Sequence, residues 1–211
     1  MTMTDSAKLS ALKVGVDVPW VTSWTGEPVL GVRPCPSVNG ALAIVQADHA
    51  GHGKPLYSQN HAVRQRLSVR DMLCPMCGKP TPPEDRYTQV AHPFTAGALR
   101  ATGRGGALPA DIEDDRVLID AGAIAPLHRA CSTRSLRYCP HLKADPNIDV
   151  RPFPRSWVVL PLTVRAEAPP QLFLARAEPR REVPVIGFLQ LCGLTDQRDP
   201  SWRSRSQPAA G

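Results

Sequence analysis

The stretch Leu73-Cys-Pro-Met-Cys-Gly-Lys79 decides what kind of fold this chain can form. Two cysteines separated by two residues in a tight turn can bind the same metal ion, because Zn–S distances of about 2.3 Å bring both thiolates to one point. The glycine after the second cysteine permits a positive φ, which leaves backbone amides free to face the sulfurs. This pattern is typical of a zinc knuckle, and a tetrahedral ion then requires two further ligands.

The other two ligands are expected from a downstream segment rich in cysteine and histidine. A helix is predicted over residues 126–138, because proline suits the first helical turn. His128 and Cys131 are three residues apart at the start of this helix, so both can reach one ion. Cys139 would lie about 12 Å from Cys131 along the helix, which is too far for a shared ion unless the helix breaks between them.

The predicted ligand set is therefore Cys74, Cys77, His128 and Cys131, and Cys139 or His141 in place of His128 is the alternative. Four protein ligands leave no position for water, so the one Zn²⁺ expected here is structural and not catalytic. A redox pair is the less favoured interpretation of the two knuckle cysteines. Such a motif would begin a helix, whereas here a helix precedes the motif and a glycine follows it.

The rest of the chain predicts an α+β fold. The 23 prolines exclude a long coiled coil or helical bundle, because each interior proline removes a helical hydrogen bond. We expect short strands and two helices, over residues 60–73 and 126–138, around the zinc site. Strand-like segments at 14–46 and 155–191 would flank it on the N- and C-terminal sides, and the glycine-rich residues 95–110 predict a flexible loop.

We expect one domain. A loose N-terminus over residues 1–13 would be followed by a zinc-containing α+β domain over 14–195, with its zinc core at about 60–142, and by a disordered tail over 196–211. The sequence shows no secretory signal, and its longest apolar runs fall far short of the ~20 residues that cross a bilayer. A cytoplasmic protein without membrane contact is predicted. In the reducing cytosol, cysteines are better suited to bind metal than to form disulfides.

The charge pattern permits an acidic partner. The formal net charge is +6, and basic residues are concentrated on both sides of the predicted zinc site. Arg66 and Arg70 are four residues apart, and Arg134 and Arg137 are three apart, so each pair would share a helix face. These four arginines are the predicted contacts to a partner, either a nucleic acid or a protein complex, between which the sequence does not choose. The sequence is silent on oligomeric state.

A knuckle pair combined with a ligand pair at a helix N-terminus resembles the treble-clef zinc fingers. The 50 residues between Cys77 and His128 exceed the usual gap in a small finger and predict an inserted hairpin that carries the glycine-rich loop. Some treble-clef proteins are HNH-type nucleases, and Val90-Ala-His-Pro-Phe-Thr-Ala-Gly97 is faintly similar to their segment. A metal-dependent nuclease using His92 is therefore the alternative function. Ala91 stands where that family has an acid or a second histidine, so we favour a zinc-stabilised binding or regulatory protein without catalytic residues.

Several short stretches also resemble a group of actinobacterial and phage proteins. They are Trp24-Thr-Gly-Glu-Pro28, His61-Ala-Val-Arg-Gln-Arg66, Leu73-Cys-Pro-Met-Cys-Gly78 and Leu136-Arg-Tyr-Cys-Pro-His-Leu142. In those proteins the positions of His128 and Cys131 are often two cysteines, which suits a ligand role. The resemblance implies a zinc-containing α+β fold over about residues 18–192, and it implies no activity.

Overall fold

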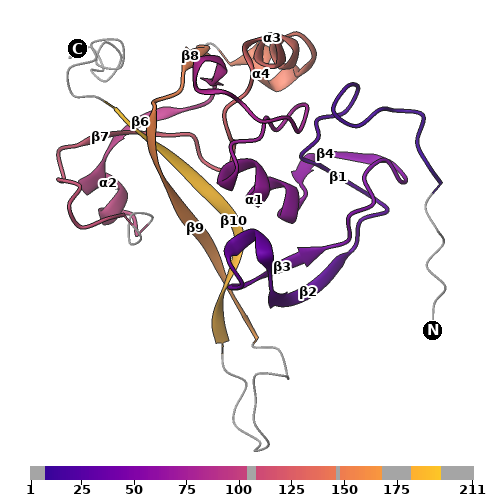
Figure 1. Cartoon of the computed structure of the whole chain (residues 1–211), viewed down its shortest axis with the longest axis horizontal. Coiled ribbons are helices and arrows are strands. Elements are labelled where there is room, and N and C mark those ends of the chain that lie inside the picture. Colours follow the sequence, from indigo (N-terminus) through magenta and orange to yellow (C-terminus); the bar gives the residue numbers. More distant parts are fainter. Residues whose placement is uncertain (1–7, 104–107, 146–147, 168–181, 196–211) are drawn as a thin grey trace, which may run out of the picture.

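The structure, a computed structural model, describes residues 8–103, 108–145, 148–167 and 182–195, and Figure 1 shows their arrangement. The predicted tail at 196–211 lies outside the described residues. The described helices are α1 (Ala62–Arg70), α2 (Ala96–Ala101), α3 (Arg129–Tyr138) and α4 (Pro140–Ala144), with 3-10 turns η1 (Pro36–Val38) and η2 (Pro83–Asp85). The strands are β1 (Thr22–Trp24), β2 (Val29–Pro34), β3 (Leu42–Gln46), β4 (Pro55–Asn60), β5 (Tyr87–Thr88), β6 (His92–Thr95), β7 (Val117–Asp120), β8 (Arg151–Pro152), β9 (Ser156–Glu167) and β10 (Glu182–Leu194).

The long strand β10 is the spine of the main sheet. It pairs antiparallel with β9 over its length, and its other edge pairs parallel with β3 near Ile186 and antiparallel with β7 from Cys192 to Leu194. β2 extends the sheet beyond β3, and β6 extends it beyond β7. Figure 1 shows β9 and β10 crossing the molecule as a long ribbon. The apolar sequence of β10 fits this central place, because both of its faces are covered.

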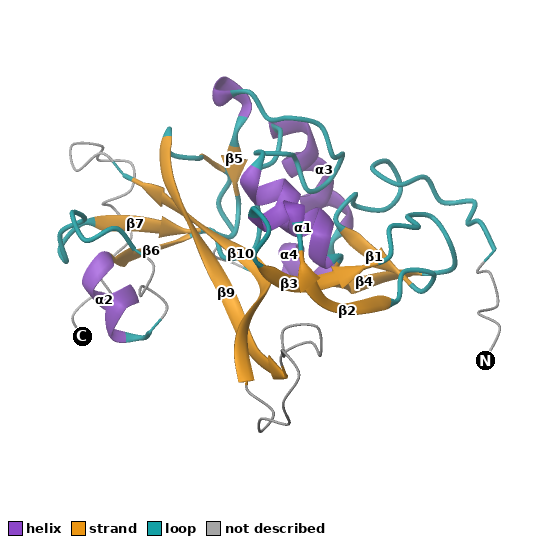
Figure 2. Ribbon diagram, turned by 60° about the horizontal axis from the view of Figure 1, so that its bottom comes forward, coloured by secondary structure: helices purple, strands orange, loops and turns teal. Residues whose placement is uncertain are grey.

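Neighbouring residues of β10 point into two separate cores, because successive side chains in a strand alternate between faces. Leu189 and Leu191 pack with Val69 and Met72, at the end of α1, on one face. Cys192 packs on the other face with Ala96 and Leu99 of α2. Figure 2 shows α1 and α2 on opposite sides of the sheet.

Polar side chains of α1 form hydrogen bonds with β10 between the residue that pairs with β3 and the residues that pair with β7. The backbone N–H of Leu189 donates to Gln65 Oε1 at 2.9 Å, and Gln65 Nε2 donates back to the Leu189 carbonyl at 2.7 Å. Arg66 donates to the carbonyls of Gly187 and Ile44, both at 2.7 Å. Buried backbone polar groups must find partners, and here helix side chains replace the missing strand. This contact also fixes α1, and the knuckle that follows it, against the sheet.

The α+β class is confirmed, and three regions differ from the sequence-based expectation. The glycine-rich segment 95–110 contains α2, whose N-cap Thr95 accepts a hydrogen bond from the Ala98 N–H, so local capping favours a helical turn there. α4 was not expected either. The described part of the N-terminus is not loose: Ser10 donates to the Gly51 carbonyl, and Lys8 accepts from the Gly53 N–H. Backbone pairing with a later loop holds this segment, and nothing in its own composition indicates it.

The predicted inserted hairpin between the ligand pairs has a counterpart in β6 and β7. They pair antiparallel from His92↔Asp120 to Thr95↔Val117, and α2 lies between them in the chain. The predicted helices correspond to α1 and α3, each starting two or three residues later than expected. Within the described residues, none of the helices has the length and apolar character needed to span a membrane.

Candidate metal centre

The four predicted ligands come together in the structure. Cys74, Cys77, His128 and Cys131 each offer a ligand atom, and all four atoms lie within 4.8 Å of one another. His128 Nδ1 is 3.4 Å from Cys77 Sγ and 4.0 Å from Cys131 Sγ. Ligand atoms around a tetrahedral ion with bonds of about 2.0–2.3 Å lie roughly 3.5–3.8 Å apart. The donor set and its spacing therefore fit a divalent metal ion. Cys139 and His141, the alternative ligands, do not belong to this group.

The knuckle is a short hairpin that follows α1. Leu73 and Pro80 form a β-bridge, the Cys74 N–H donates to the Lys79 carbonyl at 2.8 Å, and the Gly78 N–H donates to the Cys74 carbonyl at 2.8 Å. Gly78 has a φ of +74°, as the turn requires. This backbone arrangement places both cysteines on the inner side of the turn, with Cys74 fully buried.

The second ligand pair comes from the start of α3. His128 is the N-cap residue and Cys131 lies in the first turn. The positive end of the helix dipole faces the sulfurs there, which favours thiolates. His128 Nε2 is 3.0 Å from the Pro80 carbonyl. Because that nitrogen must carry the proton to donate to a carbonyl, the Nδ1 lone pair faces the sulfurs, which is the orientation a metal-binding histidine needs.

The Cys74 and Cys131 thiols of this cluster resist ionisation unless a cation is present. Burial raises the pKa of Cys74, against the lowering effect of the backbone N–H groups of His128, Cys77 and Met76. The pKa of Cys131 is raised to about 12, first by burial and then by Cys74 and Cys77 nearby. Three thiolates this close repel one another, and a bound divalent cation would remove that penalty. The electrostatics thus agree with the geometry.

A segment that the sequence did not indicate supports the site from the N-terminal side. The Trp20 N–H donates to the Met76 carbonyl, and the Val21 N–H donates to the Pro75 carbonyl, both at 3.0 Å. The Gly15 carbonyl accepts a hydrogen bond from Arg134 on α3 at 3.0 Å. Residues 15–21 therefore contact both halves of the candidate metal site, although they lie outside the segment 60–142 predicted to form its core.

Gly78→Ala is expected to destabilise the protein, because a Cβ there would lie 2.8 Å from the Trp20 ring and would occupy a positive φ. The backbone strain alone costs about 1–2 kcal/mol, and displacement of Trp20 adds to it. Urea unfolding would measure the loss. Gly103→Ala is the matched control, since Gly103 has a φ of +73° and nothing within 4 Å of its added Cβ. Equal losses in the two variants would show that the Trp20 contact contributes nothing.

The structure corrects part of the predicted arginine surface. Arg66 is fully buried and bonded to Ser37 and to backbone carbonyls, so it cannot contact a partner. Arg70 is exposed, but its guanidinium pairs with the adjacent Asp71. Arg134 is half-buried against Gly15. Arg137 remains exposed, with its guanidinium 5.5 Å from the Tyr138 ring centre. The i, i+4 pattern of Arg66 and Arg70 did not reveal that the Arg66 position faces the sheet.

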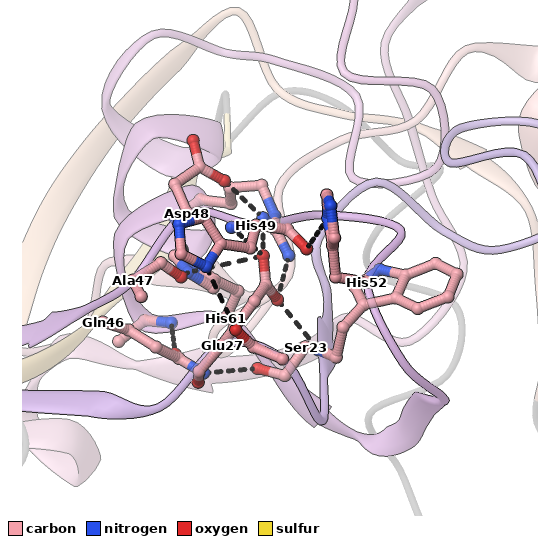
Figure 3. Close-up of polar contacts among 12 residues, drawn as sticks. Ser23, Glu27, Gln46, Ala47, Asp48, His49, His52 and His61 are labelled. Carbon is pink, nitrogen blue, oxygen red and sulfur yellow. Dashed lines mark hydrogen bonds and ion pairs between the residues drawn. The ribbon is translucent and has the colours of Figure 1, made fainter. Parts of the chain in front are cut away.

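A second group of potential ligands, Glu27, Asp48 and His61, also lies within 4.8 Å of one another. Arg64 supplies the positive charge there: its guanidinium donates to both oxygens of Glu27, at 2.6 and 2.8 Å, and to Asp48 at 2.7 Å. Figure 3 shows this cluster beside His49 and His52. His61 uses both nitrogens, Nε2 toward the Ala47 carbonyl and Nδ1 as acceptor of the Arg64 N–H. The arrangement is that of an ion-pair network in which Glu27, His61 and Arg64 are buried and Asp48 is exposed.

His92, on which the nuclease alternative rests, is exposed on β6. Among the residues described, it belongs to no group of three potential metal ligands. The nuclease alternative therefore rests on the sequence likeness alone. Comparisons of the chain with protein-family models, with curated proteins and with solved structures give no match.

Proposed function

We propose that the protein is a zinc-stabilised nucleic-acid-binding protein in which one structural Zn²⁺, in a treble-clef-like arrangement, fixes α3 for contact with its partner. The observation that carries this proposal is the closed set of Cys74, Cys77, His128 and Cys131, with His128 and Cys131 at the N-terminus of α3. Three sulfurs and one imidazole are a ligand set typical of structural zinc, and four protein ligands leave no open position for catalysis.

The exposed side of α3 and α4 supports nucleic acid as the partner over a protein complex. No acidic residue occurs from Ala121 to Ala144, and Arg129, Arg137 and Lys143 are exposed along these two helices. Figure 1 shows α3 and α4 at the edge of the molecule. An exposed run of cations without acids is suited to contact with phosphates, whose neutralisation releases counterions.

Replacing Arg137 and Lys143 with alanine is expected to weaken binding to DNA or RNA at low salt. The slope of log K against log salt concentration should fall by about 2, because each phosphate contact contributes roughly one unit. Melting temperature and zinc content should stay unchanged, since both side chains are exposed. Fluorescence anisotropy over a salt series, with parallel elemental analysis, measures all three quantities.

The matched control is Arg33→Ala with Lys54→Ala, which removes the same charge from β2 and from the loop before β4. An equal effect of the two double variants would show non-specific attraction and contradict an interface on α3. Absence of binding to any nucleic acid at low salt would favour the protein-complex alternative. Mg²⁺- or Mn²⁺-dependent plasmid nicking that is lost in His92→Ala would establish the nuclease alternative instead.

A further inference from the structure

Aromatic rings accompany the arginines on the exposed side of α3 and α4. Tyr138, at the end of α3, is 69% exposed, so most of its ring is accessible to solvent. The Arg137 guanidinium lies 5.5 Å from its ring centre, and at the start of the helix the Arg129 guanidinium lies 5.7 Å from the ring centre of Tyr87. Two arginine–tyrosine pairs thus mark the two ends of one helix.

The spacing of these pairs suits several nucleotides. Arg129 and Arg137 are eight residues apart, roughly 12 Å at 1.5 Å per residue. That length corresponds to three or four stacked nucleotides at about 3.4 Å each. Thr133, four residues from each arginine, is also exposed. Arg129, Thr133 and Arg137 thus form an exposed stripe of small and cationic side chains along α3.

The charge is strongest at the Tyr138 end. His141 and Lys143 are exposed on α4, directly after the Arg137–Tyr138 pair. Two acids lie at the ends of this surface: Asp85 accepts from the Arg129 N–H at 2.8 Å, and Asp145 is the C-cap of α4. A phosphate would therefore be attracted mainly to the region between Arg137 and Lys143, next to the exposed ring.

We propose that this surface binds single-stranded nucleic acid, with the Tyr138 ring as a stacking platform for a base and with Arg137 and Lys143 contacting the flanking phosphates. This inference rests on the proposed function and specifies the class of ligand. Duplex DNA can interact with such a surface only through its phosphate charges, because its bases are already stacked on each other. Unpaired bases can also stack on an aromatic ring. The ring of Tyr138 gives a single strand an additional contact.

The test measures the affinity of the protein for a labelled 12-nucleotide oligonucleotide by fluorescence anisotropy at low salt. The oligonucleotide is supplied as single-stranded DNA, as single-stranded RNA and as a DNA duplex. Tyr138→Ala should weaken single-strand binding roughly tenfold and leave duplex binding within about twofold, since one base–aromatic stack is lost. Tyr138→Phe keeps the ring and should bind like the wild type. Tyr57→Ala, which removes a 65% exposed tyrosine from β4, should change nothing. The DNA and RNA arms identify the natural source of the strand.

The outcomes separate the two proposals. If duplex and single strand bind equally well and Tyr138→Ala weakens neither, the stacking role is wrong while nucleic-acid binding stands. If no oligonucleotide binds, both proposals fail. If Tyr138→Phe binds as weakly as Tyr138→Ala, the hydroxyl and not the ring makes the contact, which also overturns stacking. Zinc content and melting temperature, measured for every variant, confirm that the folded protein is being compared.

Discussion

Cys74→Ser is expected to release the metal ion and to leave the protein unfolded at 37 °C. Cys74 is the fully buried member of the ligand group, and Leu73, Thr81 and the knuckle hydrogen bonds around it depend on the same turn. Structural zinc contributes apparent binding free energy of about 10–16 kcal/mol, which matches or exceeds the ~5–15 kcal/mol stability of a typical domain. Elemental analysis and circular-dichroism melting would show less than one zinc per chain and no cooperative transition.

Cys139→Ser is the control for this prediction. Cys139 lies at the junction of α3 and α4, it is half-buried, and it is outside the ligand group. The variant is expected to keep one zinc per chain, with a change in unfolding free energy of about 0.5 kcal/mol or less. The ligand assignment would be wrong if Cys74→Ser kept its metal and its melting temperature, or if Cys139→Ser lost them.

Glu27→Gln is expected to lower the free energy of unfolding by about 3–5 kcal/mol, because it removes the buried charge opposite Arg64. The Glu27 side chain is fully buried, and that of Arg64 is 3% exposed. The carboxylate also accepts hydrogen bonds from the Trp24 and His49 N–H groups, so it connects β1 with the loop before β4. Of its two ion pairs, the buried guanidinium would keep the one with Asp48 and lose the one with Glu27. Urea unfolding at neutral pH measures the loss.

Asp48→Asn removes the other, exposed carboxylate that pairs with Arg64, and so tests whether burial makes the Glu27 ion pair the stronger one. The Asp48 side chain is 73% exposed, so its ion pair with Arg64 is expected to contribute only about 0–1 kcal/mol. Similar losses in both variants would contradict the view that burial makes Glu27 the essential partner. A wild-type stoichiometry near two metal ions per chain, falling to one in Glu27→Gln, would show that this cluster binds metal and is not an ion-pair network.

The metal centre could be predicted from the sequence because its requirements are local. A knuckle needs two cysteines two residues apart and a glycine, and a ligand pair at a helix start needs a spacing of three. The 8-residue gap from Cys131 to Cys139 disfavoured Cys139 as a ligand but left Cys139 and His141 open as alternatives, and the structure places both outside the ligand group. The same local reasoning failed for Arg66. Its burial depends on Ser37 and on the carbonyls of β3 and β10, segments that are 22 to 121 residues away.

The sequence by itself predicted the favoured ligand set, the α+β class and the positions of α1, α3 and the knuckle, because spacing, capping and proline act between near neighbours. Only the tertiary structure decided which polar side chains are buried. Gln65 and Arg66 complete the edge of β10, Arg64 pairs with Glu27, and residues 15–21 close over the metal site. Each of these contacts satisfies a buried charge or backbone group. The hydrogen-bond partner of each group depends on which distant segments the fold brings close to it. No periodic pattern in the sequence indicates which segments these are.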